Sequence, residues 1–359
     1  MTTPLKSQRL ESLDALRGLD LFLLVFLQPV LVSIGRVADS PTLNNVLYYF
    51  DHEVWEGFRP WDLVMPLFLF MTGAAMPFSF AKYRNGTHLS AAVYLRILRR
   101  VVVLFMLGMV VQGNLLSLKP DTWLIYTNTL QAIAVGYLIA AMILLHNRPK
   151  MQLVWTIVLL VAYWLPMAIR GDYSPEGNWA FDVDRVVLGR FRGDLSYTWV
   201  WSSLNFGVTV MLGAFTGGLM KSNKRNLHTV FVLAVVGILL VAIGLIWGTS
   251  HPVIKRLWTS SMTLYSGGWC MLLMALFYWW IDCLGFRKGI GWLKFYGMNS
   301  ITAYMLGEVI NFRSIVDSLC YGLQPIFGEW YGVWLTFGNF TIIFLILMLM
   351  YRSKTFLKV

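Results

Sequence analysis

Long apolar runs, separated by short polar, glycine- or proline-bearing turns, dominate the 359 residues of this chain. A helix needs roughly 20 mostly apolar residues to cross a lipid bilayer. The pattern therefore predicts an all-α integral membrane protein with about ten transmembrane helices. Their predicted bounds are 17–35, 62–81, 99–117, 125–145, 152–169, 198–220, 227–248, 262–283, 297–312 and 332–351.

The composition agrees with this pattern and excludes an ordinary soluble domain, because 57% of the residues are hydrophobic and only 13% are charged. No linker or low-complexity tract interrupts the chain, so we expect residues 1–359 to form a single membrane domain. Its longer loops are 36–59 and 171–198. The first residues lack the cleavage site of a signal peptide, so the first apolar run is predicted to be a retained span.

The distribution of Lys and Arg predicts the orientation, since short cytoplasmic loops are enriched in these residues. Most of the 29 basic residues fall in alternate connections, which places both termini in the cytoplasm and the 36–59 loop outside. Topology signals and contact with anionic membrane lipid account for the net charge of +11. We therefore expect no nucleic-acid partner.

The segment DHEVWEGFRPWDLVMPLFLF, residues 51–70, places ionisable groups at the mouth of a predicted span. Such groups are usually functional. His52 is suited to act as a general base near neutral pH. The alternative is an interfacial histidine that only forms hydrogen bonds. Asp62 could orient His52 or hold a substrate ammonium group; alternatively, it caps the following helix.

Other ionisable residues lie within or beside the predicted spans. Asp20 is near the start of the first span, where it could pair with Arg17 or favour the helix terminus. Glu308 lies inside the ninth predicted span and should face the bundle interior, near Asn299. His251 falls in a short external turn and is expected to be solvated.

A basic cluster at the predicted cytoplasmic side includes Arg99 and Arg100, with Lys82 and Arg84 at the end of the preceding span. Guanidinium groups bind phosphates in bidentate fashion, so the cluster could hold the phosphates of coenzyme A. The alternative is the topology signal itself. No group of residues has the ligand types and spacing of a zinc site, so we expect no metal.

Six sequence blocks, taken in order, resemble the transmembrane acyltransferases of the heparan-alpha-glucosaminide N-acetyltransferase family. The resemblance covers most of the chain. It implies acetyl transfer from cytoplasmic acetyl-CoA to the amine of an extracytoplasmic amino sugar, by a homodimer. The blocks are RLESLDALRGLDLF near the start, H-x-x-W-x-G-x-x-x-x-D-L-V-x-P at 52–66, LRRVVVLFMLGM at 98–109, TLQAIAVGYL at 129–138, PVIKRLWTSS at 252–261 and FYGMNSITAYMLGEV at 295–309.

The resemblance implies that His52 is the catalytic histidine and that Arg100 contacts acetyl-CoA. It places Asn299 and Ser300 in a polar wall of the central pore. The catalytic asparagine of the family falls on Gln28 here, which carries the same amide on a longer side chain.

The LQR of the animal proteins reads LQA at 130–132, which predicts a different acceptor. The amino-terminal luminal domain of the animal enzymes is absent from the sequence, which favours a protein of the bacterial inner membrane. The remaining assignments are Arg17 and Arg99 to the cofactor, and Asp20, Trp55, Gln131 and Glu308 to the substrate.

The main alternative is a proton-coupled transporter of a small sugar-like solute, in which Asp20, Asp62, Glu308 and His52 form a pathway near the membrane midplane. Such folds often contain inverted repeats. The two halves of the chain show no convincing self-similarity, so the sequence favours the acyltransferase.

Overall fold

The computed structural model describes residues 10–38, 40–80, 90–193, 196–222 and 226–357. Within these ranges every named element is helical, and the sole strand-like pairing is an isolated bridge between Glu56 and Ile254. The predicted all-α class is confirmed. The α-helices are α1 Glu11–Phe22, α2 Gln28–Gly35, α3 Pro41–Tyr49, α4 Val64–Phe80, α5 Ala91–Gln112, α6 Thr129–His146, α7 Pro149–Arg170, α8 Trp179–Leu188, α9 Ser203–Ser222, α10 Leu227–Gly248, α11 Ser260–Phe277, α12 Leu293–Met298, α13 Ser300–Val309, α14 Arg313–Cys320, α15 Gln324–Phe327 and α16 Tyr331–Arg352.

The described residues contain eight helical stretches long and apolar enough to cross a membrane. They overlap eight of the predicted spans, and together with the composition they describe a multi-pass membrane protein. The other two predicted spans differ in structure. Residues 99–117 overlap the 22-residue helix α5, which carries three arginines. Residues 297–312, predicted as one helix, are divided between α12 and α13, because Asn299 leaves the helical conformation with φ −117° and ψ 41°.

Close helix packing fixes α4, the helix that follows Asp62. A Cβ added at Gly73 of α4 would overlap the backbone of α9, and one added at Gly213 of α9 would overlap the backbone of α4. Small residues allow such close approach between membrane helices. The start of α4 therefore has a fixed position in the bundle.

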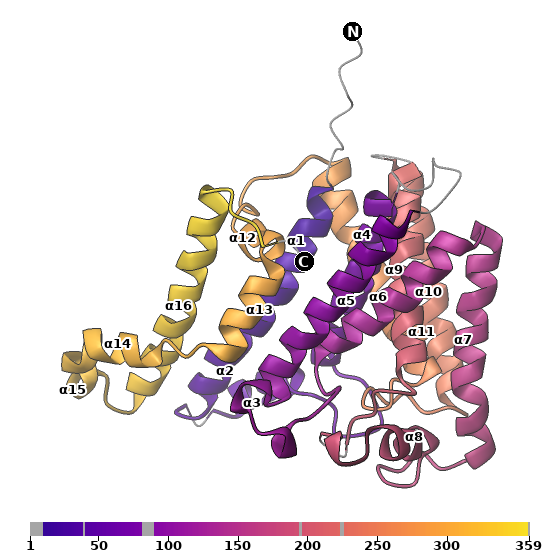
Figure 1. The fold of residues 1–359 in the computed structure, drawn as a ribbon. Helices are drawn as coiled ribbons and strands as arrows, with labels where there is room; N and C mark the ends of the chain where they lie inside the picture. The colour runs from indigo at the N-terminus through magenta and orange to yellow at the C-terminus, as the bar shows by residue number, and fades with distance from the viewer. Residues whose placement is uncertain (1–9, 39, 81–89, 194–195, 223–225, 358–359) are drawn as a thin grey trace.

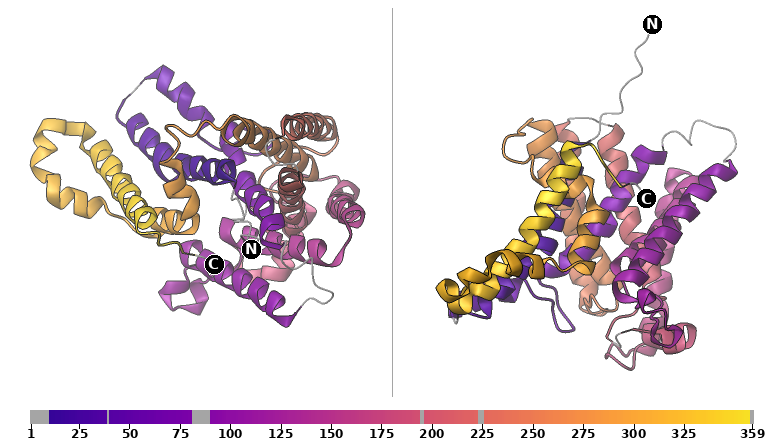
Figure 2. Two further views of the ribbon diagram at one scale, coloured as in Figure 1. Left: turned by 90° about the horizontal axis from the view of Figure 1, so that it is seen from above. Right: turned by 60° about the vertical axis from the view of Figure 1, so that its left-hand side comes forward.

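The connections that carry polar residues gather at one end of the helices. Figure 1 shows α3 and α8 at the lower end of the bundle, and α14 to the left, beside the lower part of α16. The 36–59 loop contains α3, and the 171–198 loop contains α8. Figure 2 shows α14, α15 and α16 extending from one edge of the bundle. The loop that carries His52 and the 171–198 loop thus lie at the same end of the bundle.

Candidate active site

Asp62 lies in a short 3-10 turn, Pro60–Leu63, that leads into α4. Its Oδ2 accepts hydrogen bonds from the backbone N–H groups of Arg59, at 2.9 Å, and Glu53, at 3.2 Å. Its side chain is fully buried. The carboxylate therefore caps the helix start, as one interpretation of the sequence predicted, and its other oxygen remains available for a second role.

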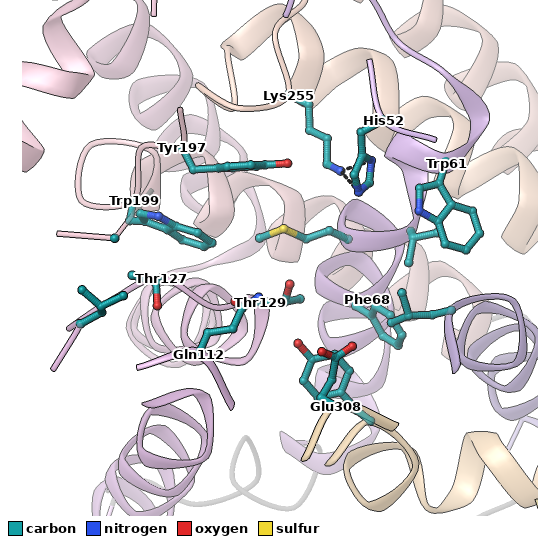
Figure 3. A pocket seen from close by; sticks show the side chains of 16 residues that line it. His52, Trp61, Phe68, Gln112, Thr127, Thr129, Tyr197, Trp199, Lys255 and Glu308 are labelled. Carbon is teal, nitrogen blue, oxygen red and sulfur yellow. Dashed lines mark hydrogen bonds between the residues drawn. The ribbon is translucent and has the colours of Figure 1, made fainter. Parts of the chain in front are cut away.

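That other oxygen, Asp62 Oδ1, lies 2.8 Å from Nδ1 of His52 and 3.3 Å from Nζ of Lys255. Lys255 Nζ is also 2.8 Å from His52 Nδ1 and 3.4 Å from His52 Nε2. Figure 3 shows the lysine and histidine converging at one wall of a cavity. The three side chains form a compact cluster of a carboxylate, an imidazole and an amine.

Only one of the two short contacts at His52 Nδ1 can be a hydrogen bond at a given time. If Nδ1 carries a proton and donates to Asp62, it cannot accept from Lys255, and the ammonium instead donates to Asp62 Oδ1. Nε2 then keeps its lone pair. In this tautomer it is Nε2 that can accept a proton, and the Asp62 carboxylate favours it by accepting from Nδ1–H.

Lys255 was missed by the sequence reasoning, although it lies in the block PVIKRLWTSS. Its side chain is 7% exposed. Burial lowers the pKa of Lys255 to about 8, and the neighbouring Asp62 carboxylate partly opposes that shift. One sequence signal could have identified Lys255. It lies in a predicted external turn, whereas Lys and Arg are generally enriched on the cytoplasmic side.

An ion pair holds the segment that carries His52. Arg59 Nε donates to Glu53 Oε2 at 2.9 Å and its NH2 group donates to Glu53 Oε1 at 3.2 Å. The Arg59 guanidinium also lies 3.9 Å from the centre of the Tyr48 ring. Hydrogen bonds from Arg59 lower the pKa of the Glu53 carboxyl. These contacts connect residues 53–59 to the end of α3.

A second chain of hydrogen bonds connects three loops around the site. Trp55 Nε1 donates to the backbone oxygen of Tyr173 at 2.9 Å, and the Tyr173 hydroxyl lies 2.9 Å from His251 Nδ1. His251 Nε2 accepts from the Ser260 backbone N–H at 3.0 Å. The prediction that His251 is solvated was wrong, since it is fully buried. That burial lowers its pKa to about 4.

The cluster faces a cavity of about 480 Å³. Figure 3 shows His52 and Lys255 on one side and Gln112, Thr129 and Glu308 on the other. Aromatic side chains, among them Trp61 and Trp199, supply other parts of the wall. The cavity thus combines a potential base with apolar and hydrogen-bonding surfaces, as expected of a small-molecule site.

A neighbouring cavity of about 210 Å³ contains the predicted cofactor residues Arg17, Arg100 and Ser300. It shares wall residues with the His52 cavity, namely Phe68, Thr129 and Tyr304. The Arg100 guanidinium lies 4.5 Å from the centre of the Tyr137 ring, and its buried Nε has no hydrogen-bond partner among the described residues. The two cavities therefore lie side by side and have these three residues in common.

Two other predicted cofactor residues, Arg99 and Asn299, line neither of these cavities. Arg99 is exposed on α5 and does not line the cavities that contain Arg100 or His52. Lys82 and Arg84 lie outside the described residues. Asn299 is buried, and neither polar atom of its side chain has a hydrogen-bond partner within the described ranges.

The predicted substrate residues are divided among several positions. Glu308 lines the His52 cavity and also a third cavity that contains Gln28. Asp20 is buried and lines an apolar cavity beside Tyr265 and Trp269. These residues' functional roles remain predictions.

Gln131 is also a predicted substrate residue, and its side chain caps helix α6. Its Oε1 accepts from the backbone N–H groups of Thr127, at 2.8 Å, and Asn128, at 3.0 Å. Gln131 is fully buried. The side-chain oxygen of Gln131 is therefore occupied by the two capping hydrogen bonds. A contact between Gln131 and the substrate remains a prediction.

Comparisons with known proteins match the heparan-alpha-glucosaminide N-acetyltransferase catalytic family over residues 9–237. The human heparan-alpha-glucosaminide N-acetyltransferase is 22% identical over 365 residues, covering 84% of this chain and 53% of the human protein. The mouse protein is 23% identical, with 85% and 54% covered. The chain spans about half the length of these relatives.

Proposed function

This chain belongs to the heparan-alpha-glucosaminide N-acetyltransferase catalytic family, and on that premise we propose that it acetylates the amine of an amino sugar with acetyl-CoA. The observation that carries the proposal is the His52–Asp62–Lys255 cluster, in which Asp62 Oδ1 lies 2.8 Å from His52 Nδ1. His52 and Lys255 line a cavity that borders the cavity of Arg17 and Arg100. Amide-forming acetyl transfer needs a base for the amine and a place for the acyl donor, and we propose the first cavity for the base and the second for the donor.

Acetyl-CoA is assigned to the cavity that contains Arg17, Arg100 and Ser300. Its phosphate groups suit the two guanidinium groups, which bind phosphate oxygens through several N–H donors. The acyl end would pass the shared wall of Phe68, Thr129 and Tyr304 toward His52. Arg99 stays a proposed outer contact for the same phosphates, and Asn299 a polar group near the pantetheine arm.

The proposed reaction begins when Nε2 of His52 removes a proton from the amine of the acceptor. The amine nitrogen attacks the thioester carbonyl carbon, so that a C–N bond forms and the C–S bond breaks. Coenzyme A leaves as a thiolate, which then takes up a proton. Asp62 holds the Nδ1–H tautomer, and the positive charge of Lys255 stabilises the negative charge that develops on the carbonyl oxygen.

The remaining assignments complete the acceptor side. Glu308 lines the His52 cavity, where a carboxylate would attract an ammonium group, and Gln28 is proposed to polarise the carbonyl from the adjoining cavity.

We propose cytoplasmic termini, ten spans and an extracytoplasmic His52, because that arrangement keeps most basic residues inside. The proposed setting is a homodimer in the bacterial inner membrane.

The test is acetyl transfer from radiolabelled acetyl-CoA to a panel of amino sugars, beginning with glucosamine, by purified protein in detergent. The proposal predicts a labelled N-acetyl product that requires the protein. No product across the panel, with no measurable binding of acetyl-CoA, would contradict it. Uptake of an unmodified sugar into proteoliposomes under a proton gradient would instead support the transporter.

A further inference from the structure

The apolar cavity that contains Asp20 has a volume of about 520 Å³ and lies between α1, α4 and α11, which contact one another. Leucines from these helices and from the Pro60–Leu63 turn form much of its wall. It shares Val64 with the His52 cavity and no described residue with the Arg17–Arg100 cavity. This Asp20 cavity is therefore a separate space of the size of a small-molecule site, and the proposed acetyl transfer does not use it.

Asp20 places an unsatisfied carboxyl group at the wall of this cavity. Its side chain is only 2% exposed, and its buried Oδ2 has no hydrogen-bond partner among the described residues. Other buried carboxylates of the protein are satisfied. Asp184, for example, accepts from the backbone N–H groups of Trp199, at 2.7 Å, and Val200, at 2.9 Å. A buried acceptor without a partner costs free energy, which a ligand that donates a hydrogen bond would recover.

Aromatic rings from two segments complete the wall. The Tyr265 ring lies between those of Phe58, with centroids 5.1 Å apart, and Trp269, with centroids 6.5 Å apart. Trp269 is exposed on α11, and Leu273, one turn further along, is half-buried. Both α1 and α11 belong to stretches long and apolar enough to cross a membrane. The cavity therefore reaches the outer surface of the bundle at helices that the bilayer surrounds, and an apolar chain can enter it from the membrane.

We propose that the Asp20 cavity binds a membrane lipid with a free hydroxyl group. The hydroxyl donates to the Asp20 carboxyl, and the apolar chain lies among the leucines and aromatic rings. A hydroxyl needs one acceptor for its single donor hydrogen and brings no charge into the cavity. An ammonium group has three donors and must lose its hydration, which pairing with one carboxylate repays poorly. The site therefore favours an alcohol over an amine.

The test is photo-crosslinking in phosphatidylcholine nanodiscs with hexadecanol that carries a diazirine in its chain. Adducts are mapped by mass spectrometry, and unlabelled hexadecanol is compared with its methyl ether as competitor. The ether has the same chain but no donor hydrogen. We expect adducts on α1 and α11 and a competing concentration roughly tenfold lower for the alcohol, the size of one hydrogen bond to a buried acceptor.

Three variants locate the site. Asp20→Ala should abolish the difference between alcohol and ether, and it should fold, because Oδ2 has no partner to lose. Leu273→Trp should fill the cavity and remove the adducts. Leu276→Trp is the matched control, since Leu276 is exposed on the same helix and does not line the cavity, and its labelling should equal that of wild type.

The comparison of competitors in wild type tests the inference without any variant and without acetyl transfer, so its outcome is independent of the proposed function. Equal competition by hexadecanol and its methyl ether would overturn it. Stronger competition by hexadecylamine than by hexadecanol would reassign the site to a cationic amphiphile and also overturn it. Adducts that persist unchanged in folded Leu273→Trp would show that the alcohol binds elsewhere.

Discussion

Asp62→Asn is the change with the most specific expected consequence. The backbone N–H groups of Glu53 and Arg59 both donate to Oδ2, so the asparagine must place its remaining oxygen there. Its NH2 group then takes the position of Oδ1, 2.8 Å from His52 Nδ1 and 3.3 Å from Lys255 Nζ. A donor at this position forces Nδ1 to accept and moves the imidazole proton to Nε2. His52 can then no longer act as the base at Nε2.

The loss expected from removing a general base is roughly 10²–10⁴-fold in kcat. Breaking a buried ion pair is also destabilising, by about 3–5 kcal/mol when the partner stays charged. Lys255 limits that cost by releasing its proton. Folding is therefore checked by size-exclusion chromatography and thermal unfolding before kcat is measured with saturating acetyl-CoA.

The matched control is Asp51→Asn. Asp51 is adjacent to His52, and its carboxylate accepts a hydrogen bond from the backbone N–H of His52 at 2.8 Å. The Asp51 side chain is nevertheless 76% exposed. An asparagine oxygen can accept the same bond, so kcat should stay within about threefold of wild type, as for most surface substitutions. A folded Asp62→Asn protein with the kcat of Asp51→Asn would refute the tautomer argument.

Three further predictions concern Lys255, Arg100 and His251. Wild-type kcat should fall as the pH rises through about 8, where Lys255 loses its charge. Lys255→Met should remove this alkaline limb and lower kcat roughly 10²-fold; an unchanged limb would exclude the lysine as its source. Arg100→Gln should raise the KM for acetyl-CoA about tenfold without changing acceptor KM, whereas Arg148→Gln, at an exposed arginine before α7, should change neither; equal effects in both variants would contradict the assignment. Because burial lowers the pKa of His251 from 6.5 to about 4, the unfolded chain binds more protons between these values, and the free energy of unfolding should fall by about 3 kcal/mol as the pH drops through this window. His251→Gln should flatten this part of the stability curve in chemical unfolding, and a curve parallel to wild type would show that another group titrates.

The sequence predicted those parts of the structure that depend on local pattern. The long apolar helices followed from run length. For Asp62, helix capping and the orientation of His52 were predicted as alternatives, and the structure shows both contacts on one carboxylate. Lys255 lies 203 positions from His52, so their contact depends on tertiary packing that no local pattern contains. His251 was predicted incorrectly in part for the same reason, since its contact with Tyr173 joins residues 78 positions apart.

Interrupted helices were also difficult to predict. The apolar run around Asn299 is continuous in hydropathy, yet the backbone turns there and separates α12 from α13. The resulting cavities determine where polar residues can act. Gln28 and Glu308 were both proposed as site residues from sequence, but only the fold places them on the walls of one cavity.

The central claim, that His52 removes a proton from the acceptor amine during acetyl transfer, is tested most directly by single-turnover kinetics of wild type and His52→Ala. Radiolabelled acetyl-CoA is bound first, its affinity is measured, and glucosamine is then added. The account predicts similar acetyl-CoA binding in both proteins and a transfer rate lowered at least roughly 10²-fold in the variant. Transfer by folded His52→Ala at the wild-type rate would contradict it.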